Sequence, residues 1–361
     1  MASTGILPDS EIAALFQAGA LAAPRPLDAD QIQPASLDLR LGDVAYRVRA
    51  SFLPGPGSRV AEKLDRLSLH EIPLSDGAVL ETGCVYIVPL MESLALPADV
   101  SASANPKSST GRLDIFTRVM TDHGQEFDKI AAGYSGPLYL EVSPRTFPIV
   151  VRPGSRLSQI RFRRGNALLT ENDLADLHER ETLVAAEKPN ISGGGIALSI
   201  DLEGGPNGLV GYRAKHHTSL IDVDRKAAHE IHEFWEPLYN HGSKDLILDP
   251  DEFYILVSRE AVHVPPAYAA EMTPFDPLVG EFRVHYAGFF DPGFGHSAAG
   301  GMGSRAVLEV RSHEVPFILE HGQIVGRLVY ERMAALPRTL YGADLKSNYQ
   351  GQALKLSKHF R

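Results

Sequence analysis

The chain has 361 residues, of which 44% are hydrophobic and 22% charged, so it is long enough for two buried cores and is neither disordered nor fibrous in composition. Its formal net charge of −10 argues against a general nucleic-acid surface, because binding to a polyanion requires a basic footprint. Cys84 is the only cysteine, which excludes a disulfide within the chain.

The sequence carries no signal for secretion or for insertion into a membrane. Residues 1–10 lack a basic region followed by an apolar run, and no run in the chain is long enough to cross a membrane. We therefore expect a cytoplasmic protein with no membrane partner.

The first part of the chain favours short strands rather than a helical bundle. Asp9 or Ser10 is the expected N-cap of a short helix over residues 11–16. Strands separated by Gly, Pro and Asp turns are expected from there to about Phe162.

The second part begins with a predicted helix over residues 170–187, where leucines recur at helical spacing. The glycines that follow Ser192 predict a flexible hinge. Residues 224–239 show a second helical pattern, and strands are expected again from Asp245 to about Tyr330. The polar stretch over residues 341–361 is typical of a frayed tail.

An internal repeat relates the two parts. Pairing each residue with the one 168 positions later (309 − 141) aligns Tyr86-Ile87-Val88 with Tyr254-Ile255-Leu256 and Leu140-Glu141-Val142 with Leu308-Glu309-Val310. The sequence thus predicts a tandem duplication of a compact β domain. We expect a first domain over residues 1–168, a helical linker and hinge over 169–195, a second domain over 196–335, and an arm over 336–361.

Two cations and two hydroxyls lie close together in Lys107-Ser108-Ser109-Thr110-Gly111-Arg112, a composition that suits an anionic group such as a phosphate. An alternative is an ordinary helix start with a solvated arginine. The second copy lacks these side chains: the positions 168 residues after Lys107, Ser108, Ser109 and Arg112 hold Phe275, Asp276, Pro277 and Gly280. The phosphate-directed chemistry is therefore expected in the first copy.

A Gly133-Tyr134-Ser135-Gly136 turn precedes a predicted strand that contains Glu141. Alternation along this strand places Glu141 on the face opposite Leu138 and Leu140. A carboxylate at such a position is either an exposed residue of a half-buried strand or a general base that faces a pocket.

These motifs together resemble the active-site signature of dCTP deaminases, which belong to the trimeric dUTPase superfamily. Residues 7–12, 35–42 and 94–100 resemble flanking segments of that family, and Asn348-Tyr349-Gln350-Gly351-Gln352 with Leu356-Ser357-Lys358 resembles its C-terminal arm. The resemblance implies a mainly β protein with two dUTPase-like barrels (β-clip or jelly-roll-like). It also implies a closed homo-oligomer, with a trimer favoured.

The implied reaction is deamination of dCTP to dUTP with release of ammonia, catalysed by a hydrolase that acts on a C–N bond of a cyclic amidine. The resemblance implies that Glu141 shuttles protons between water and the base, that Ser108 positions the water, and that Arg112 stabilises the transition state. The implied substrate-binding residues are Lys107, Ser109, Thr121, Asp122, Tyr134, Lys346, Tyr349, Gln350 and Gln352. Tyr134 is expected beside the sugar, and the last four are expected in a lid over the triphosphate.

A zinc site of the deaminase kind uses His-x-Glu followed by Pro-Cys-x-x-Cys, and a single cysteine cannot build it. We therefore expect a zinc-independent enzyme. The substrate that the resemblance implies would bring Mg²⁺ bound to its triphosphate, and no cluster in the sequence predicts a metal site formed by the protein.

Two other functions compete with this interpretation. The first is dUTP hydrolysis to dUMP, alone or together with deamination. Ala131-Ala132 stands where that reaction usually places an aspartate, although Asp122 or Asp128 could substitute. The second is a catalytically silent nucleotide-binding regulator, against which the joint presence of Lys107, Ser108, Arg112 and Glu141 argues. Asp291-Pro292-Gly293 of the second copy resembles a turn of the family, so the second copy could complete the site.

Overall fold

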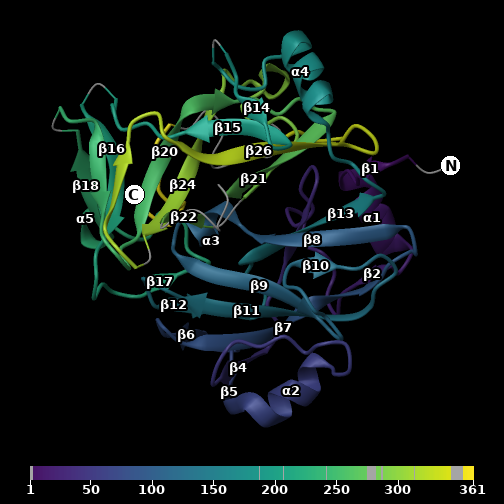
Figure 1. Cartoon of the computed structure of the whole chain (residues 1–361). Helices are drawn as coiled ribbons and strands as arrows, with labels where there is room; N and C mark the ends of the chain where they lie inside the picture. The colour runs from purple at the N-terminus through teal and green to yellow at the C-terminus, as the bar shows by residue number, and fades with distance from the viewer. Residues whose placement is uncertain are drawn as a thin grey trace. The chain divides into compact units, whose positions relative to one another are not determined.

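The computed structural model describes residues 3–186, 188–205, 207–240, 242–274, 282–285, 288–312, 314–342 and 353–361. The chain divides into two compact units, and Figure 1 labels their strands and helices where there is room. Unit 1 comprises Met1–Ala167, His217–His229 and Ser357–Arg361, and unit 2 comprises Leu168–His216 and Glu230–Leu356.

The described residues of unit 1 form three β-sheets and three helices. One sheet runs β1-β13-β8-β10 with β3 also paired to β13, the second runs β5-β4-β7-β11-β9 with β2 paired to β7, and the third runs β17-β12-β6. Its elements are β1 (Gly5–Ile6), α1 (Asp9–Gln17), β2 (Leu21–Ala22), β3 (Leu37–Leu39), β4 (Val44–Val48), α2 (Val60–Leu67), β5 (Ser68–Pro73), β6 (Ala78–Leu80), β7 (Val85–Ala95), β8 (Val100–Pro106), α3 (Ser108–Gly111), β9 (Ile115–Thr121), β10 (Lys129–Ile130), β11 (Ser135–Pro144), β12 (Ile149–Val151), β13 (Ser158–Arg164) and β17 (Ile221–Asp222).

Where the structure describes unit 2, its strands also form three sheets. They run β14-β15-β26-β21-β23, β18-β16-β20-β24-β22 and β19-β25. Its elements are α4 (Glu171–Arg180), β14 (Ile191–Ser192), β15 (Gly195–Ser199), β16 (Leu209–Ala214), α5 (Ile231–Phe234), β18 (Trp235–Tyr239), β19 (Asp245–Leu248), β20 (Tyr254–Val262), β21 (Tyr268–Pro274), β22 (Phe282–His285), β23 (Phe289–Phe290), η1 (Ser297–Ala299), β24 (Ser304–Ser312), β25 (Phe317–Glu320) and β26 (Ile324–Arg332).

The sheets confirm the internal repeat. The strand order β4-β7-β11-β9 of unit 1 recurs as β16-β20-β24-β22 in unit 2, and the β6–β12 pair recurs as β19–β25. Adding 168 to the bounds of β8 gives 268–274, which are the bounds of β21. The register recurs as well, because Glu141 lies opposite Ile87 and Glu309 lies opposite Ile255. The two copies therefore share one sheet topology.

The helices agree only in part with the expectation. A helix forms at residues 9–17, but its N-cap is Pro8, so Asp9 and Ser10 are its first residues rather than its cap. The predicted helix at 170–187 is the shorter α4, capped by Thr170. Among the described residues, no helix is long and apolar enough to cross a membrane.

The predicted helix at 224–239 is wrong. Only one turn forms, α5, and the following residues are strand β18, which pairs with β16. Pro237 lies inside β18 and explains the difference, because proline lacks the N–H that a helix interior requires. The glycine run predicted as a hinge forms the turn of the β14–β15 hairpin. Helix α2 was not predicted, although Val60, Leu64 and Leu67 follow a helical spacing.

Strand β11 has both faces buried, which explains how a carboxylate comes to lie inside unit 1. Leu138 and Leu140 are fully buried on one face, and Glu141 on the other face is 1% exposed. On the side of Glu141, α2 covers the sheet by packing Val60 and Leu64 in one cluster with Ile87, Met120 and Tyr139. Glu141 is therefore not the exposed strand residue of the alternative interpretation.

Candidate functional site

The turn between β8 and β9 carries the cation and hydroxyl motif. Lys107 is the N-cap of the single helical turn α3, and its carbonyl accepts hydrogen bonds from Thr110 N (2.8 Å) and Gly111 N (2.9 Å). Arg112 follows as the C-cap and is buried, while Ser108 and Lys107 keep part of their surface exposed. The motif thus forms one compact turn at the end of β8.

A buried carboxylate holds the first residue of this turn. Lys107 Nζ is ion-paired with Asp38 Oδ2, and Arg156 Nη1 lies 3.5 Å from the same oxygen. Asp38 is 1% exposed, and its Oδ1 has no hydrogen-bond partner among the described residues. Asp38 lies in the motif that resembles the first strand of the family, but sequence alone did not indicate that it orients Lys107.

Glu141 forms an ion pair that the sequence analysis missed. Its Oε1 accepts hydrogen bonds from Arg118 Nε (3.0 Å) and Arg118 Nη2 (2.6 Å). The two residues lie opposite each other on β11 and β9, so they share a face of the sheet. The other oxygen, Oε2, is buried and has no partner among the described residues. Cross-strand register would have revealed Arg118, but a single sequence does not provide it.

Arg118 is held in place by aromatic rings. Its guanidinium carbon lies 3.5 Å from the centroid of Phe127 and 4.8 Å from that of Phe116. Its Nη2 also donates to Ser51 Oγ at 2.7 Å. Stacking and hydrogen bonds together fix the planar guanidinium, and with it the carboxylate of Glu141.

Asp128 places a second carboxyl group beside this pair. Its Oδ1 accepts from Val119 N at 2.7 Å, next to Arg118 in the chain, and its backbone is left-handed at φ 60°. Burial raises the pKa of Asp128 to about 7, against the opposing effects of the Val119 hydrogen bond and of Arg118. Asp128 is therefore poised to exchange a proton near neutral pH.

Within one chain, the α3 turn and Glu141 are separated along the sheet. Glu141 lies opposite Arg118, whereas Pro144 lies opposite Ile115, the first residue of β9 after α3. Three residue steps of a strand span roughly 10 Å. Ser108 and Arg112 therefore do not reach Glu141 through the shared sheet of a single chain.

The Gly-Tyr-Ser-Gly turn is built around the Tyr134 ring. Gly133 has φ +73°, a conformation that favours glycine, and a Cβ added at Gly136 would lie 2.7 Å from the Tyr134 hydroxyl. That hydroxyl donates to Pro137 O at 2.7 Å and accepts from Asp122 N at 3.2 Å. Burial raises the pKa of Tyr134 to about 12. Both glycines are required for this arrangement.

Three of the predicted substrate residues, Thr121, Asp122 and Tyr134, line one cavity of about 820 Å³. The carboxylate of Asp122 also accepts from Val60 N (2.8 Å) at the start of α2. This contact gives Asp122 a structural role beside the predicted one. Lys107, Ser108, Ser109, Arg112 and Glu141 are not among the residues that line this cavity.

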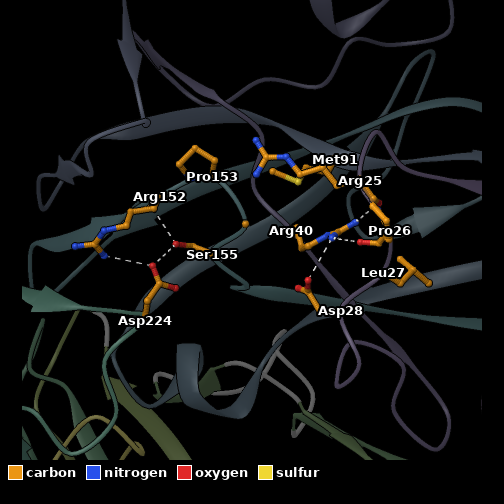
Figure 2. Close-up of a pocket in the computed structure, with 11 residues that line it drawn as sticks. Arg25, Pro26, Leu27, Asp28, Arg40, Met91, Arg152, Pro153, Ser155 and Asp224 are labelled. Atoms are coloured by element: carbon orange, nitrogen blue, oxygen red, sulfur yellow. Dashed lines mark hydrogen bonds and ion pairs between the residues drawn. The ribbon is translucent and has the colours of Figure 1, made fainter.

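A second cavity of unit 1, of about 580 Å³, lies between the loops that carry Arg40 and Arg152 (Figure 2). The Arg40 guanidinium donates hydrogen bonds to Glu92 and to the carbonyls of Pro26 and Arg25. Arg152 forms ion pairs with Asp222 and Asp224. None of the predicted site residues lines this cavity.

Four predicted residues, Lys346, Tyr349, Gln350 and Gln352, lie outside the described residues, so their place relative to the site stays a prediction. In the described part of the chain no three His, Cys, Asp or Glu side chains gather as a metal-binding group. What the described residues offer chemically is a buried carboxylate with one partnered and one unpartnered oxygen, and a separate cationic turn.

Comparisons with known proteins cover nearly the whole chain. The family model of the 2'-deoxycytidine 5'-triphosphate deaminase N-terminal domain matches residues 3–166, and that of the C-terminal domain matches residues 170–360. A dCTP deaminase of Shewanella amazonensis is 34% identical over 168 residues, which are 44% of this chain and 82% of the relative. A dCTP deaminase of Shewanella loihica is 33% identical over the same shares.

A solved structure is much closer in sequence. The crystal structure of the 2'-deoxycytidine 5'-triphosphate deaminase from Agrobacterium tumefaciens is 76% identical, with a TM-score of 0.89. The match covers 93% of this chain and 100% of that one. The mainly β, dUTPase-like fold expected from the sequence is confirmed by this similarity.

Proposed function

The chain belongs to the 2'-deoxycytidine 5'-triphosphate deaminase family, and on this premise we propose that it deaminates dCTP to dUTP and ammonia. The observation that carries the proposal is the state of Glu141. One of its carboxylate oxygens is fixed by Arg118, while the other is buried with no partner among the described residues. A fixed carboxylate with an unoccupied acceptor is suited to take and return protons.

In the proposed mechanism, the oxygen of a water molecule forms a bond with C4 of cytosine as Glu141 Oε2 accepts a proton from that water. Glu141 then transfers this proton to the exocyclic nitrogen, and the C4–N bond breaks with its electron pair leaving on ammonia. The remaining proton of the water moves from the new C4 oxygen to N3, which gives uracil. Ser108 positions the water and Arg112 stabilises the charge that develops on the ring. A positioned general base contributes about 10²–10⁴-fold to such a rate. No zinc takes part, since the chain has one cysteine where the zinc deaminases use a pair.

The proposed site is shared between copies of the chain. Along the sheet of one chain, Glu141 lies roughly 10 Å from the pair Pro144–Ile115, and the α3 turn comes before Ile115, so we infer that the two are too far apart to contact the same atom of one cytosine ring. We therefore assign Ser108 and Arg112 of one copy to the Glu141 of another, in a homo-oligomer for which a trimer is favoured.

The triphosphate is assigned to the cationic turn. Lys107 and Ser109 are the proposed phosphate contacts, together with Lys346, Tyr349, Gln350 and Gln352 of the arm. Mg²⁺ arrives with the substrate, bound to phosphate oxygens. Thr121, Asp122 and Tyr134 are assigned to the base and sugar because they line one cavity.

Asp128 supports one alternative. A carboxyl group with a pKa of about 7 could activate water for attack on the α-phosphate, which would make the enzyme a dUTP diphosphatase or a bifunctional enzyme that yields dUMP. The third candidate, a silent nucleotide-binding regulator, would bind dCTP without turnover.

The test is to incubate the purified protein with dCTP and Mg²⁺, to measure ammonia, and to resolve the nucleotides by chromatography. Formation of dUTP that is lost in Glu141→Gln supports the deaminase. Formation of dUMP and pyrophosphate, lost in Asp128→Asn, supports the bifunctional enzyme. Binding of dCTP with no product supports the regulator. Sedimentation analysis of the same sample measures the oligomeric state.

A further inference from the structure

The small sheets of the two units differ by one strand. In unit 1, β12 lies between β6 and β17, and β17 pairs with it in parallel (Figure 1). In unit 2 the corresponding strands β25 and β19 form a sheet of two, and no third strand of the described residues pairs with β25. The strand that covers β12 in unit 1 therefore has no counterpart among the described strands of unit 2.

Backbone hydrogen bonds attach β17 to β12. Ile221 N donates to Pro148 O at 2.9 Å, and Val223 N donates to Val150 O at 3.3 Å. Successive residues of a strand direct their N–H and C=O groups to opposite sides, so Val150 faces β17 while the residues before and after it face β6. A strand added at this edge therefore binds through the backbone of the residue at the position of Val150.

The residue at that position in unit 2 is Ile318 (150 + 168). It lies opposite Ile247 of β19, as Val150 lies opposite Val79 of β6, so the register of the two sheets is the same. The N–H and C=O of Ile318 are therefore directed away from β19, toward the edge that β17 covers in unit 1. β25 thus presents the same backbone template for an added strand.

The outward face of this sheet is apolar beside that edge. Ile247 and Ile318 are 57% and 58% exposed and lie opposite each other. On the inward face, Leu248 and Leu319 are fully buried in the core of unit 2. In unit 1 the counterpart of Ile318, Val150, is half-buried beside β17. Two adjacent aliphatic side chains exposed next to a strand edge are typical of a surface that binds an extended segment.

Charge indicates which kind of segment fits this edge. In unit 1, Asp222 of β17 lies opposite Val150 and accepts hydrogen bonds from Arg152 at 2.8 and 2.9 Å. In unit 2 the position of Arg152 holds Glu320, which lies opposite Asp245, and both carboxylates are exposed. Like charges directly opposite each other destabilise a sheet, so a cation on an added strand would be stabilising. A matching strand therefore carries a lysine or an arginine where β17 carries Asp222.

We propose that the edge of β25 is a docking site for an extended, basic segment of a partner protein, which adds a third strand as β17 does in unit 1. The segment places an aliphatic side chain at the position of Ile221 and a cation at the position of Asp222. A second copy of this chain fits less well, because the chain has a net charge of −10 and pairing β25 with itself would bring the carboxylates of both copies together.

The docking site is independent of the proposed reaction, because the second copy of the repeat lacks the cations and hydroxyls that we assign to dCTP. Loss of deaminase activity would leave it untouched, and so would the loss of docking leave the reaction.

The first experiment uses two synthetic peptides with the sequence of residues 218–224. One carries Asp222→Arg and Asp224→Arg, and the other is unchanged. Binding of each labelled peptide to the whole protein is measured by fluorescence anisotropy. The arginine-containing peptide should bind at least about 10-fold more tightly, because its charge is opposite to that of Glu320 and Asp245. Equal affinities, or no binding of either peptide, would overturn the proposal.

The second experiment exchanges the charge on the protein. Glu320→Arg should reverse the preference, so that the unchanged peptide binds about 10-fold more tightly than the arginine-containing one. The control Glu233→Arg makes the same substitution at another exposed position of unit 2 and should keep the preference of the unmodified protein. An unaltered preference in a folded Glu320→Arg would contradict the role of this edge.

Amide hydrogen exchange of the unmodified protein tests the edge without any variant. The Ile318 amide should exchange quickly in the protein alone, and about 10-fold more slowly when the arginine-containing peptide is present at about ten times its dissociation constant. Slow exchange in the protein alone that becomes fast on dilution would mean that a second copy covers the edge. Slow exchange at every concentration would mean that another segment of the same chain covers it. Either result would overturn the docking of a separate partner.

Discussion

The two units share a strand order and a register but differ in the side chains at one position of that register. In unit 1 the carboxylate of Glu141 lies opposite Arg118 on the neighbouring strand, whereas in unit 2 Glu309 lies opposite His285. The cations and hydroxyls of the α3 turn are likewise confined to the first copy. A sheet of this kind therefore folds without the groups that we assign to chemistry, so the fold by itself does not imply the proposed activity.

The largest effect is expected from substituting the glutamate that the two units share, Glu141 in unit 1 and Glu309 in unit 2. Glu141→Gln removes the proton acceptor, so we expect kcat for dCTP to fall by about 10²–10⁴-fold. Glu309→Gln makes the same substitution at the corresponding place of unit 2 and should leave kcat unchanged. Both variants are assayed for dUTP formation and for dCTP affinity. Equal losses in the two variants would show that the second copy also has an active site.

Buried charge offers a second contrast between the units. Glu92 is fully buried and accepts from Arg40 Nε and Gln31 Nε2, both at 2.8 Å, whereas the corresponding Glu260 is only half-buried and accepts from Ser199. Glu92→Gln removes the buried counter-ion of Arg40 and leaves only the half-exposed Asp28, 3.7 Å away, so it should cost about 3 kcal/mol in the free energy of unfolding. Glu260→Gln should cost about 1 kcal/mol. Urea denaturation measures both, and equal costs would contradict the argument.

Each unit also has a cross-strand ion pair between an arginine and a glutamate, and the two pairs have similar geometry. Arg118 contacts Glu141 through Nε (3.0 Å) and Nη2 (2.6 Å), and Arg213 of unit 2 contacts Glu236 through Nε (3.1 Å) and Nη2 (2.6 Å). Lysine keeps the charge but loses the planar fork and the ring stacking. Arg118→Lys should therefore lower kcat by roughly 10- to 100-fold, because a small misplacement of a catalytic group is costly.

The matched control for this prediction is Arg213→Lys, in an exposed pair that should contribute at most about 1 kcal/mol to stability and nothing to kcat. As a positioning residue, Arg118 should affect kcat more than KM and should shift the pH dependence of kcat. A change in KM alone would mean that Arg118 contacts the nucleotide instead.

The smallest predicted effect concerns two aspartates whose pKa values shift in opposite directions. The pKa of Asp128 in unit 1 is raised by burial from 3.8 to about 7. In unit 2, burial of Asp201 is outweighed by its hydrogen bonds, that of Arg305 foremost, and its pKa is lowered. Because the folded state holds the Asp128 proton more tightly than the unfolded state does, this contribution to stability is lost as the pH rises from about 4 through 7.

Asp128→Asn removes the titration while the amide oxygen can still accept from Val119 N. Between pH 5.5 and pH 8 the wild-type protein should lose about 1–2 kcal/mol of stability relative to Asp128→Asn. Thermal denaturation of both proteins at the two pH values measures the difference. A parallel pH dependence of the two proteins would mean that Asp128 is ionised throughout this range.

Much of the fold was predictable from the sequence because strands and repeats leave periodic signals. The alternation around Glu141 and the 168-residue offset both correspond to observed strands and register. The helix predicted at 224–239 is wrong because its apolar spacing is typical of a helix, whereas Pro237 excludes a helix interior at that place. Within the site, the α3 turn was predictable because its charged and hydroxyl residues are contiguous.

The contacts that fix the site could not be predicted, because they join residues far apart in the chain. Arg118 and Glu141 are 23 residues apart, and Ser357 and Ser109 are 248 residues apart. Nothing local distinguishes Arg118 from a solvated arginine until the strand register is known.

The place of Ser357–Arg361 in unit 1 also bears on how the protein is made. A ribosome synthesises the chain from its N-terminus, so the strands of the first unit emerge long before these five residues do. Until then the carbonyl of Ser109 has no Ser357 hydroxyl to bind, and Val223 lacks the His359 ring. The unit that emerges first is thus the later one to be completed, after all the strands of the second have been translated.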